Sequence, residues 1–324
     1  MVETTIRPVL EVIDLRVATV ATASEPSREV LKGVSLSVFP GEMLGVVGES
    51  GAGKTVLGLA SLGIFPGGLH ITGGTVSFEG QNLLRKSDND LRQIRGKYLA
   101  MIMAGGRSSL NPMETAGTQI QNVIRSHLDV DKQTARRMTI EILDAVGIND
   151  PERRIDAYPH ELSGGMAQRI LIAQAMVCEP KVLIADEPTS DLDVTVAAQV
   201  LDQMKDLIDK ENAATIMLTR DLGIIAQYCD RIAVLTEGEI VEYASVTSFF
   251  KEAHHPYSST LLASAVAARS YEADGSELRA GQWSKSGSKR REAKTSGNSY
   301  NITPSILESP DFIKISEEHF VGRS

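Results

Sequence analysis

Eight consecutive residues constrain the fold of this 324-residue chain more than any other segment. They read GESGAGKT, which matches the pattern G-x-x-x-x-G-K-[ST]. An apolar segment at residues 43–47 precedes them, and a helical pattern at residues 54–62 follows. In this setting the backbone N–H groups and the positive end of the helix point at one anion. The sequence therefore predicts an α/β fold with a phosphate loop made of Gly48, Glu49, Ser50, Gly51, Ala52, Gly53, Lys54 and Thr55.

Two of these side chains suit a nucleoside triphosphate. The Lys54 ammonium can reach the β- and γ-phosphates, and the Thr55 hydroxyl can bind Mg²⁺. Mg²⁺ also needs a carboxylate, and the apolar segment at residues 182–185 leads directly into Asp186 and Glu187. We predict that Asp186 binds Mg²⁺ through its water shell and that Glu187 is the general base that polarises the attacking water. The alternative is that the two acids only cap a strand.

A second glycine-containing helix start lies at Ser163, Gly164 and Gly165, here called the signature segment. Ser163 is a good N-cap, so an ordinary helix start is the simplest interpretation. The paired glycines would also expose a second anion site, and one ATP cannot fully use two separate cradles. This redundancy indicates a nucleotide shared between two subunits.

Composition argues against several classes of protein. The chain has 33 Lys and Arg against 42 Asp and Glu, a net charge of −9, which disfavours a general nucleic-acid binder. Cys178 and Cys229 lack the spacing of a zinc site or a disulfide framework, so we predict two buried thiols. No segment approaches the ~18 apolar residues of a membrane span, and the N-terminus lacks the apolar core of a signal peptide. We expect a chain of cytosolic origin.

The order of patterns predicts alternating strands and helices, a mostly parallel sheet and a helical insert at about residues 86–160, with Gly147 as a helix C-cap. The polar, basic segment 284–301 is expected to be a solvated linker, with a membrane-surface or partner contact as the alternative. A hairpin is expected at Glu237-Gly238. The other expected elements are strands at 10–15, 34–39, 43–47, 182–186 and 214–219, and helices at 54–62, 163–178 and 194–210.

Four motifs in order, GESGAGKT, LSGGM, VLIADEP and SDLD, resemble those of ATP-binding cassette (ABC) proteins. More narrowly, SLNP, YPHELSGGMAQR, DEPTSDLDVTV and HHPYSSTLL resemble the ATPase subunits of dipeptide and oligopeptide importers. The resemblance covers about residues 8–265. It implies a P-loop NTPase fold: an ABC ATP-binding domain at 1–265, with a RecA-like core, an antiparallel β subdomain and a helical subdomain at about 86–160. A C-terminal extension at 266–324 would follow.

The resemblance also implies a head-to-tail dimer, with ATP and Mg²⁺ held between the phosphate loop of one subunit and the signature segment of the other. The expected partners are a second ATPase subunit, two transmembrane permeases and, through the complex, an extracytoplasmic substrate-binding protein. The expected location is the cytoplasmic face of the bacterial inner membrane, where the chain would be peripheral.

Three nucleotide-facing positions depart from the family pattern. Ala104 stands where the family has a glutamine, Arg220 where it has a switch histidine, and Thr19 where it has an adenine-stacking aromatic residue. Arginine is always charged and cannot shuttle a proton, although it can hold a phosphate. We therefore expect a degenerate site that binds Mg-ATP and hydrolyses it poorly, beside a competent site on a different ATPase subunit. The alternative is that Arg220 compensates and both sites turn over.

The C-terminal extension departs as well. Family members often carry cysteines there that hold an iron–sulfur cluster, but no cysteine follows Cys229, although residues 310–321 resemble the closing stretch. We expect a docking or dimer-contacting appendage without a metal, partly a disordered linker.

The leading hypothesis is the energising subunit of a peptide-type importer. The alternatives are a nearly inactive structural or allosteric cassette subunit, the ATPase of a nickel or opine-like importer, and a cassette ATPase acting on ribosomes or DNA. The last is disfavoured because the chain has neither a second cassette nor a long basic insertion.

Overall fold

The computed structural model describes residues 7–22, 26–272, 312–316 and 319–322. The expected linker at 284–301 lies outside these residues. The chain divides into two units, residues 1–84 with 217–324 and residues 85–216, each described here by itself. Within the described residues, no helix is both long enough and apolar enough to cross a membrane.

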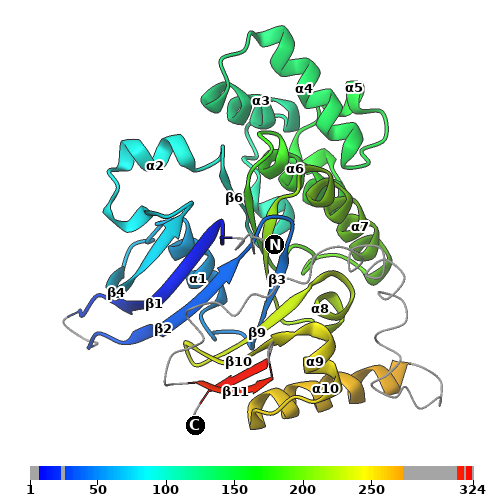
Figure 1. The fold of residues 1–324 in the computed structure, drawn as a ribbon. Helices are drawn as coiled ribbons and strands as arrows, with labels where there is room; N and C mark the ends of the chain where they lie inside the picture. The colour runs from blue at the N-terminus through cyan, green and yellow to red at the C-terminus, as the bar shows by residue number, and fades with distance from the viewer. Residues whose placement is uncertain (1–6, 23–25, 273–311, 317–318, 323–324) are drawn as a thin grey trace, which may run out of the picture. The chain divides into compact units, whose positions relative to one another are not determined.

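The first unit contains an antiparallel sheet with the strand order β2-β1-β4-β5 (Figure 1). In its central strand, Leu10 and Val12 are fully buried, and after a register shift so are Leu15 and Val17, as expected of a sheet with one covered face. The strands are β1 (Leu10–Thr19), β2 (Glu29–Val38), β4 (Leu69–Phe78) and β5 (Gln81–Asn82).

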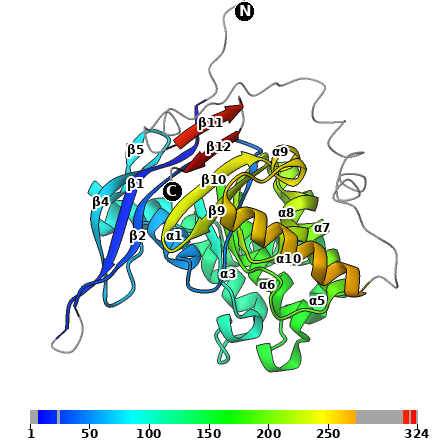
Figure 2. The ribbon, with the colours of Figure 1, turned by 90° about the horizontal axis from the view of Figure 1, so that it is seen from below.

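The other strands of the first unit follow in the order β11-β12-β10-β9-β3, with β3 parallel to β9 and the remaining pairs antiparallel. Figure 2 shows the C-terminal strands, in red, alongside β10. The strands are β3 (Met43–Val47), β9 (Arg231–Thr236), β10 (Glu239–Ser245), β11 (Phe312–Ser316) and β12 (His319–Gly322). The helices are α1 (Lys54–Ser61), α8 (Leu222–Tyr228), α9 (Val246–Lys251) and α10 (Pro256–Glu272).

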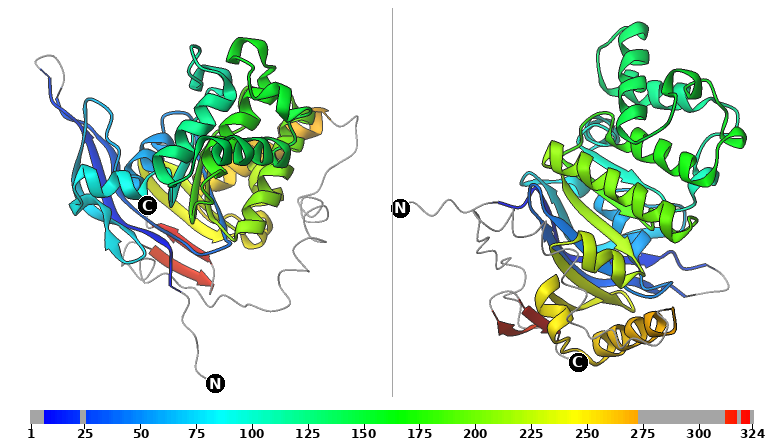
Figure 3. Two further views of the ribbon diagram at one scale, coloured as in Figure 1. Left: turned by 90° about the horizontal axis from the view of Figure 1, so that it is seen from above. Right: turned by 90° about the vertical axis from the view of Figure 1, so that its right-hand side faces the viewer.

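The second unit is mainly helical, and its helices α3, α4 and α6 pack against one another (Figure 3, green). Its strands β6 (Leu99–Ile102) and β7 (Val182–Asp186) pair in parallel, and β8 (Ala214–Thr219) crosses the boundary between the units. Its α-helices are α2 (Asp88–Ile94), α3 (Ala116–His127), α4 (Lys132–Ala145), α5 (Pro151–Arg154), α6 (Gly164–Met176) and α7 (Val194–Glu211). The 3-10 turns are η1 (Leu83–Arg85), where the two units meet in sequence, η2 (Gly106–Ser109) and η3 (Pro159–Glu161).

The structure confirms most of the predicted elements. Strands β3, β7 and β8 have the predicted bounds, the hairpin at Glu237-Gly238 joins β9 to β10, and Gly147 follows α4 with a φ of 75°. One prediction was wrong: strand pairing is mixed rather than mostly parallel. The segment 86–160, expected to be a helical insert, also contains the buried strand β6. In addition, β1 and β2 extend beyond their expected ranges.

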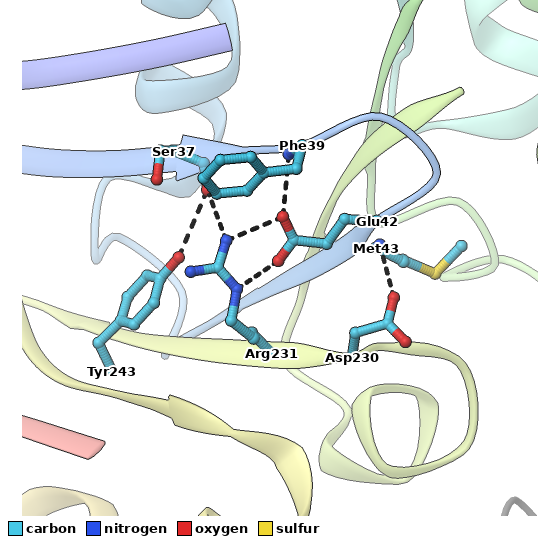
Figure 4. Close-up of polar contacts among 7 residues, drawn as sticks. All are labelled: Ser37, Phe39, Glu42, Met43, Asp230, Arg231 and Tyr243. Carbon is cyan, nitrogen blue, oxygen red and sulfur yellow. Dashed lines mark hydrogen bonds and ion pairs between the residues drawn. The ribbon is translucent and has the colours of Figure 1, made fainter. Parts of the chain in front are cut away.

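A buried ion pair holds the strand that leads into the phosphate loop. Arg231, at the start of β9, donates from Nε and Nη2 to the carboxylate of Glu42, the residue before β3 (Figure 4). Arg231 Nη2 also donates to Ser37 O at 3.0 Å. Burial raises the pKa of Tyr243, so its hydroxyl stays protonated and donates to the same carbonyl. These contacts join β9 and β10 to the end of β2 and the start of β3.

Candidate nucleotide-binding site

The phosphate loop connects β3 to α1 within the first unit. Its glycines are required for different reasons. A Cβ on Gly48 would lie 2.1 Å from Leu235 O, so only glycine fits. Gly51 and Gly53 have φ values of 84° and 107°, a region that side chains rarely adopt. Among the described residues, no atom lies within 4 Å of a Cβ placed on Gly51, so this part of the loop is open. Gly238 N, in the β9–β10 hairpin, donates to Ala52 O at 3.1 Å.

Lys54 is the first residue of α1, and its side chain is buried. Its Nζ donates to Gly48 O at 2.7 Å and to Glu49 O at 3.0 Å, so the ammonium is held by the loop itself. The first turn of α1, which is fully described, carries no acidic side chain that would offset the positive end of the helix. The exposed Thr55 hydroxyl and Ser50 lie in the same loop. This arrangement suits a polyanion.

The two predicted acids lie in the second unit. Asp186 is the last residue of β7 and is 1% exposed. Glu187 follows with a φ of 43°, a left-handed conformation that costs energy in a residue other than glycine. The Thr55 hydroxyl and the Asp186 carboxylate are hard oxygen donors of the kind that Mg²⁺ prefers, and Mg²⁺ usually takes one or two protein ligands together with substrate phosphates. The donor types therefore fit Mg²⁺.

The signature segment opens α6 in the second unit. Ser163 is the N-cap of this helix, as predicted, and its Oγ accepts from Met166 N at 3.2 Å. Ser163, Gly164 and Gly165 line a cavity of about 470 Å³ together with residues that include Arg154 and Asp191. The structure thus supports both interpretations of the segment: an ordinary cap, and a helix N-terminus that borders open space.

The structure also shows the surroundings of the three residues that depart from the family pattern. Ala104 is exposed in the loop after β6, where its carbonyl accepts from Ser109 Oγ at 2.9 Å. Arg220 is exposed between β8 and the N-cap of α8. Thr19 Oγ1, at the end of β1, accepts from Arg28 N at 2.9 Å. The phosphate loop, Thr19 and Arg220 belong to the first unit, whereas Ala104, Asp186, Glu187 and the signature segment belong to the second.

Sequence reasoning missed one contact of the phosphate loop. Glu49 N donates to the hydroxyl of Tyr257 at 3.3 Å. Tyr257 belongs to the segment HHPYSSTLL, which stands out in the sequence only through its resemblance to the family. Because the two residues are 208 positions apart, no local sequence pattern indicates this contact.

Comparison with known proteins decides the family. Residues 31–190 match the model of the ABC transporter family. The chain is 46% identical over 239 residues to a probable peptide ABC transporter ATP-binding protein of Sinorhizobium fredii, covering 74% of this chain and 71% of that protein. The dipeptide transport ATP-binding protein DppD of Escherichia coli is 44% identical over 241 residues, covering 74% of this chain and 73% of DppD.

The oligopeptide transport ATP-binding protein OppD of Bacillus subtilis is 37% identical over 316 residues, which cover 96% of this chain and 87% of OppD. The chain belongs to the dipeptide/oligopeptide family of ABC transporter ATP-binding proteins. The family predicted from the motifs is thereby confirmed, and so is ATP binding as the property of this ABC ATPase.

Solved structures confirm the fold of this ABC ATPase. The dimeric post-hydrolysis state of the ATP-binding cassette MJ0796, bound to ADP and Pi, matches with a TM-score of 0.65 at 22% identity, covering 73% of this chain and 98% of that one. The protein cbiO1 of Clostridium perfringens matches with a TM-score of 0.63 at 24% identity, covering 76% and 91%. The α/β cassette fold with an antiparallel β subdomain is as predicted.

Proposed function

We propose that this chain is the ATP-binding, ATP-hydrolysing subunit of a peptide-type ABC importer. The observation that carries the proposal is the position of Lys54 at the start of α1, where its ammonium donates hydrogen bonds to the carbonyls of Gly48 and Glu49. Relatives named for peptide, dipeptide and oligopeptide transport, 37–46% identical, support the substrate class. The chain acts at the cytoplasmic face of the inner membrane with a second ATPase subunit, two permeases and an extracytoplasmic substrate-binding protein.

In this proposal the chain's own groups have defined tasks. The loop N–H groups and Lys54 bind the phosphates, while Thr55 and Asp186 hold Mg²⁺. When bound, Mg²⁺ neutralises charge on the phosphate oxygens. Glu187 orients the attacking water and accepts its proton. The strained backbone of Glu187 supports this role, because such conformations are often found at functional sites.

The same proposal includes a degenerate site. Ala104 has no side-chain group that reaches Mg²⁺ or water, and an arginine such as Arg220 cannot shuttle a proton as a histidine does. The site on this chain's phosphate loop therefore binds Mg-ATP and turns it over slowly. The signature segment completes a second, competent site on the phosphate loop of the partner ATPase.

The test is ATP binding and hydrolysis by the purified chain, alone and then with its partner ATPase. Tight Mg-ATP binding with negligible turnover alone, and turnover on adding the partner, is the expected result. Asp186→Asn serves as the control for contaminating activity. Loss of one transition-state contact commonly lowers the rate by about 10² to 10³. Robust turnover by the lone chain would contradict the degenerate site, and absence of Mg-ATP binding would contradict the whole proposal.

A second candidate is a structural or allosteric cassette subunit that binds nucleotide and never hydrolyses it. The replacement of the two family residues by Ala104 and Arg220 favours it. The two candidates differ in the assembled transporter, where turnover at this chain's own site is slow in the first and absent in the second.

A further inference from the structure

The segment formed by His254, His255, Pro256 and Tyr257 has no task in the proposed function, yet it touches the phosphate loop. Tyr257 lies in the first turn of α10, and its hydroxyl accepts a hydrogen bond from Glu49 N at 3.3 Å. Burial raises the pKa of Tyr257, so the side chain is a neutral phenol near pH 7. A residue outside the loop thus holds part of the loop backbone.

The Glu49 residue is fixed on both sides. Its N–H is bound by Tyr257 Oη, and its carbonyl accepts from Lys54 Nζ at 3.0 Å. One residue therefore separates the Tyr257 hydroxyl from the ammonium that binds the phosphates. A shift of the Glu49 backbone would therefore move an acceptor of Lys54.

Tyr257 is itself held by a buried carboxylate. Glu242 of β10 is completely buried and accepts from His254 N at 2.8 Å and from His255 N at 3.0 Å, just before α10. Tyr257 N donates to the ring Nδ1 of His255 at 3.2 Å. Glu242 thus fixes the start of the helix that presents Tyr257.

The same carboxylate receives a residue from the C-terminal hairpin, the strands β11 and β12. His319 Nε2 donates to Glu242 Oε1 at 2.6 Å, and both side chains are almost completely buried. The other ring nitrogen of His319 lies 2.9 Å from Ser248 Oγ, and the ring packs on His254 with centroids 4.7 Å apart. Glu242 is therefore shared between the C-terminal hairpin and the start of α10.

We propose that Tyr257 is a positioning residue for the phosphate loop, and that Glu242 and His319 hold it there, so that docking of the C-terminal hairpin strengthens ATP binding. The contacts form one continuous path from β12 through Glu242 and the start of α10 to Glu49 and Lys54. All of its residues lie in the first unit.

The first test compares two tyrosine-to-phenylalanine variants of the full chain. Tyr257→Phe removes the acceptor of Glu49 N and keeps the ring. Tyr228→Phe is the matched control, because Tyr228 is also buried and its hydroxyl accepts from its neighbour Gln227 Nε2, at 3.1 Å, at the end of α8. The dissociation constant for Mg-ATP is measured by calorimetry, and deuterium exchange is followed at a peptide containing the Glu49 amide.

Tyr257→Phe is expected to weaken Mg-ATP binding by about 3- to 10-fold, the value of one neutral hydrogen bond, and to speed exchange at Glu49. Tyr228→Phe is expected to leave both unchanged. An affinity within twofold of wild type for Tyr257→Phe, or an equal loss in both variants, would overturn the inference. Mg-ATP binding that persists in Lys54→Ala would instead contradict the phosphate loop assignment on which the inference rests.

The second test concerns the hairpin. His319→Ala is expected to weaken binding by a similar factor, with no further loss when it is combined with Tyr257→Phe, because both act on one path. His319→Gln, whose amide can still donate to Glu242, is expected to restore part of the affinity. Unchanged affinity in His319→Ala, or full additivity with Tyr257→Phe, would overturn the role of the hairpin. If His319→Ala does not fold, His319→Phe, which keeps a ring against His254 and cannot donate to Glu242, supplies the same comparison.

Discussion

At the scale of single residues, the glycines of the phosphate loop are required by geometry, whereas Ala104 and Arg220 are not required by packing. A neighbouring carbonyl leaves no room for a side chain at Gly48, and Gly53 has a positive φ. Ala104 and Arg220 are exposed. Substitution of the two glycines should therefore disturb the backbone of the loop, whereas substitution of Ala104 or Arg220 should not.

Gly165→Asp is expected to abolish transport by the assembled complex, whereas Glu187→Gln is expected to reduce it only partly. The added Cβ would lie 2.6 Å from Val196 Cγ1, and the new carboxylate would place negative charge at the start of α6, where the partner's ATP is expected to bind. Uptake of labelled peptide by reconstituted vesicles measures both variants. An equal loss from the two would contradict the asymmetry.

The cysteines give a test that does not depend on function. Cys229 is buried as predicted, but Cys178 is only partly buried, and its burial raises the pKa of the thiol to about 11. Because only the thiolate reacts, Cys178 in the folded chain at pH 8 should react with Ellman's reagent on the order of 10²-fold more slowly than in urea, where a free thiol has a pKa of about 8.5. Comparable rates in the two conditions would refute this prediction.

At the scale of elements, the chain depends on a few buried polar contacts that join distant strands. Strands β3, β7 and β8 were predictable because each is a short run of buried apolar residues bounded by clear loop signals. Strand β6 was missed because four residues between helical segments give no period of their own. The Arg231–Glu42 and His319–Glu242 pairs were missed because their partners are 189 and 77 positions apart.

Glu42→Ala is expected to lower the free energy of unfolding by about 3 to 5 kcal/mol, because it leaves the buried Arg231 guanidinium without its carboxylate. The matched control is Glu239→Ala, whose partly exposed contact with Lys32 at 3.8 Å should contribute at most about 1 kcal/mol. Urea unfolding measures both. A similar small effect in the two variants would show that the buried pair adds little.

We expect the free energy of unfolding to fall as the pH is lowered, because the Glu242 carboxylate becomes protonated. Burial alone would raise the pKa of Glu242, but hydrogen bonds from the His319 ring and from the backbone N–H groups of His254 and His255 outweigh it, so the pKa is lowered. A lowered pKa in the folded state stabilises the fold above the unfolded value, about 4.3, and this contribution is lost as pH falls through the folded pKa.

Glu242→Gln should therefore be less stable than wild type at pH 7, and the gap should narrow as pH falls below about 4. Urea titrations across this range measure the gap. The exposed Glu239→Gln on the same strand is the control and should show little pH-dependent difference. A gap that stays constant or widens in acid would contradict the assigned role of the Glu242 charge.

At the scale of the whole molecule, the residues predicted to bind and hydrolyse the nucleotide are divided between the two units. The motifs identified the phosphate loop, the two acids and the signature segment because each is a short, continuous pattern. The contact between Tyr257 and Glu49 could not be predicted this way, because only the fold brings α10 to the loop. The chain is an ABC ATPase with a well-formed phosphate loop, and we propose that its hydrolytic chemistry is altered.

The most direct test of the proposed degenerate site restores the family residues. Ala104→Gln and Arg220→His are combined in the chain, which is assembled with a partner ATPase whose own general base has been replaced by glutamine. Single-turnover ATP hydrolysis then reports on the phosphate loop of this chain alone. The double variant is expected to hydrolyse ATP at least about 10²-fold faster than the wild-type chain. Equal rates, with the wild-type chain already turning over rapidly, would contradict this expectation.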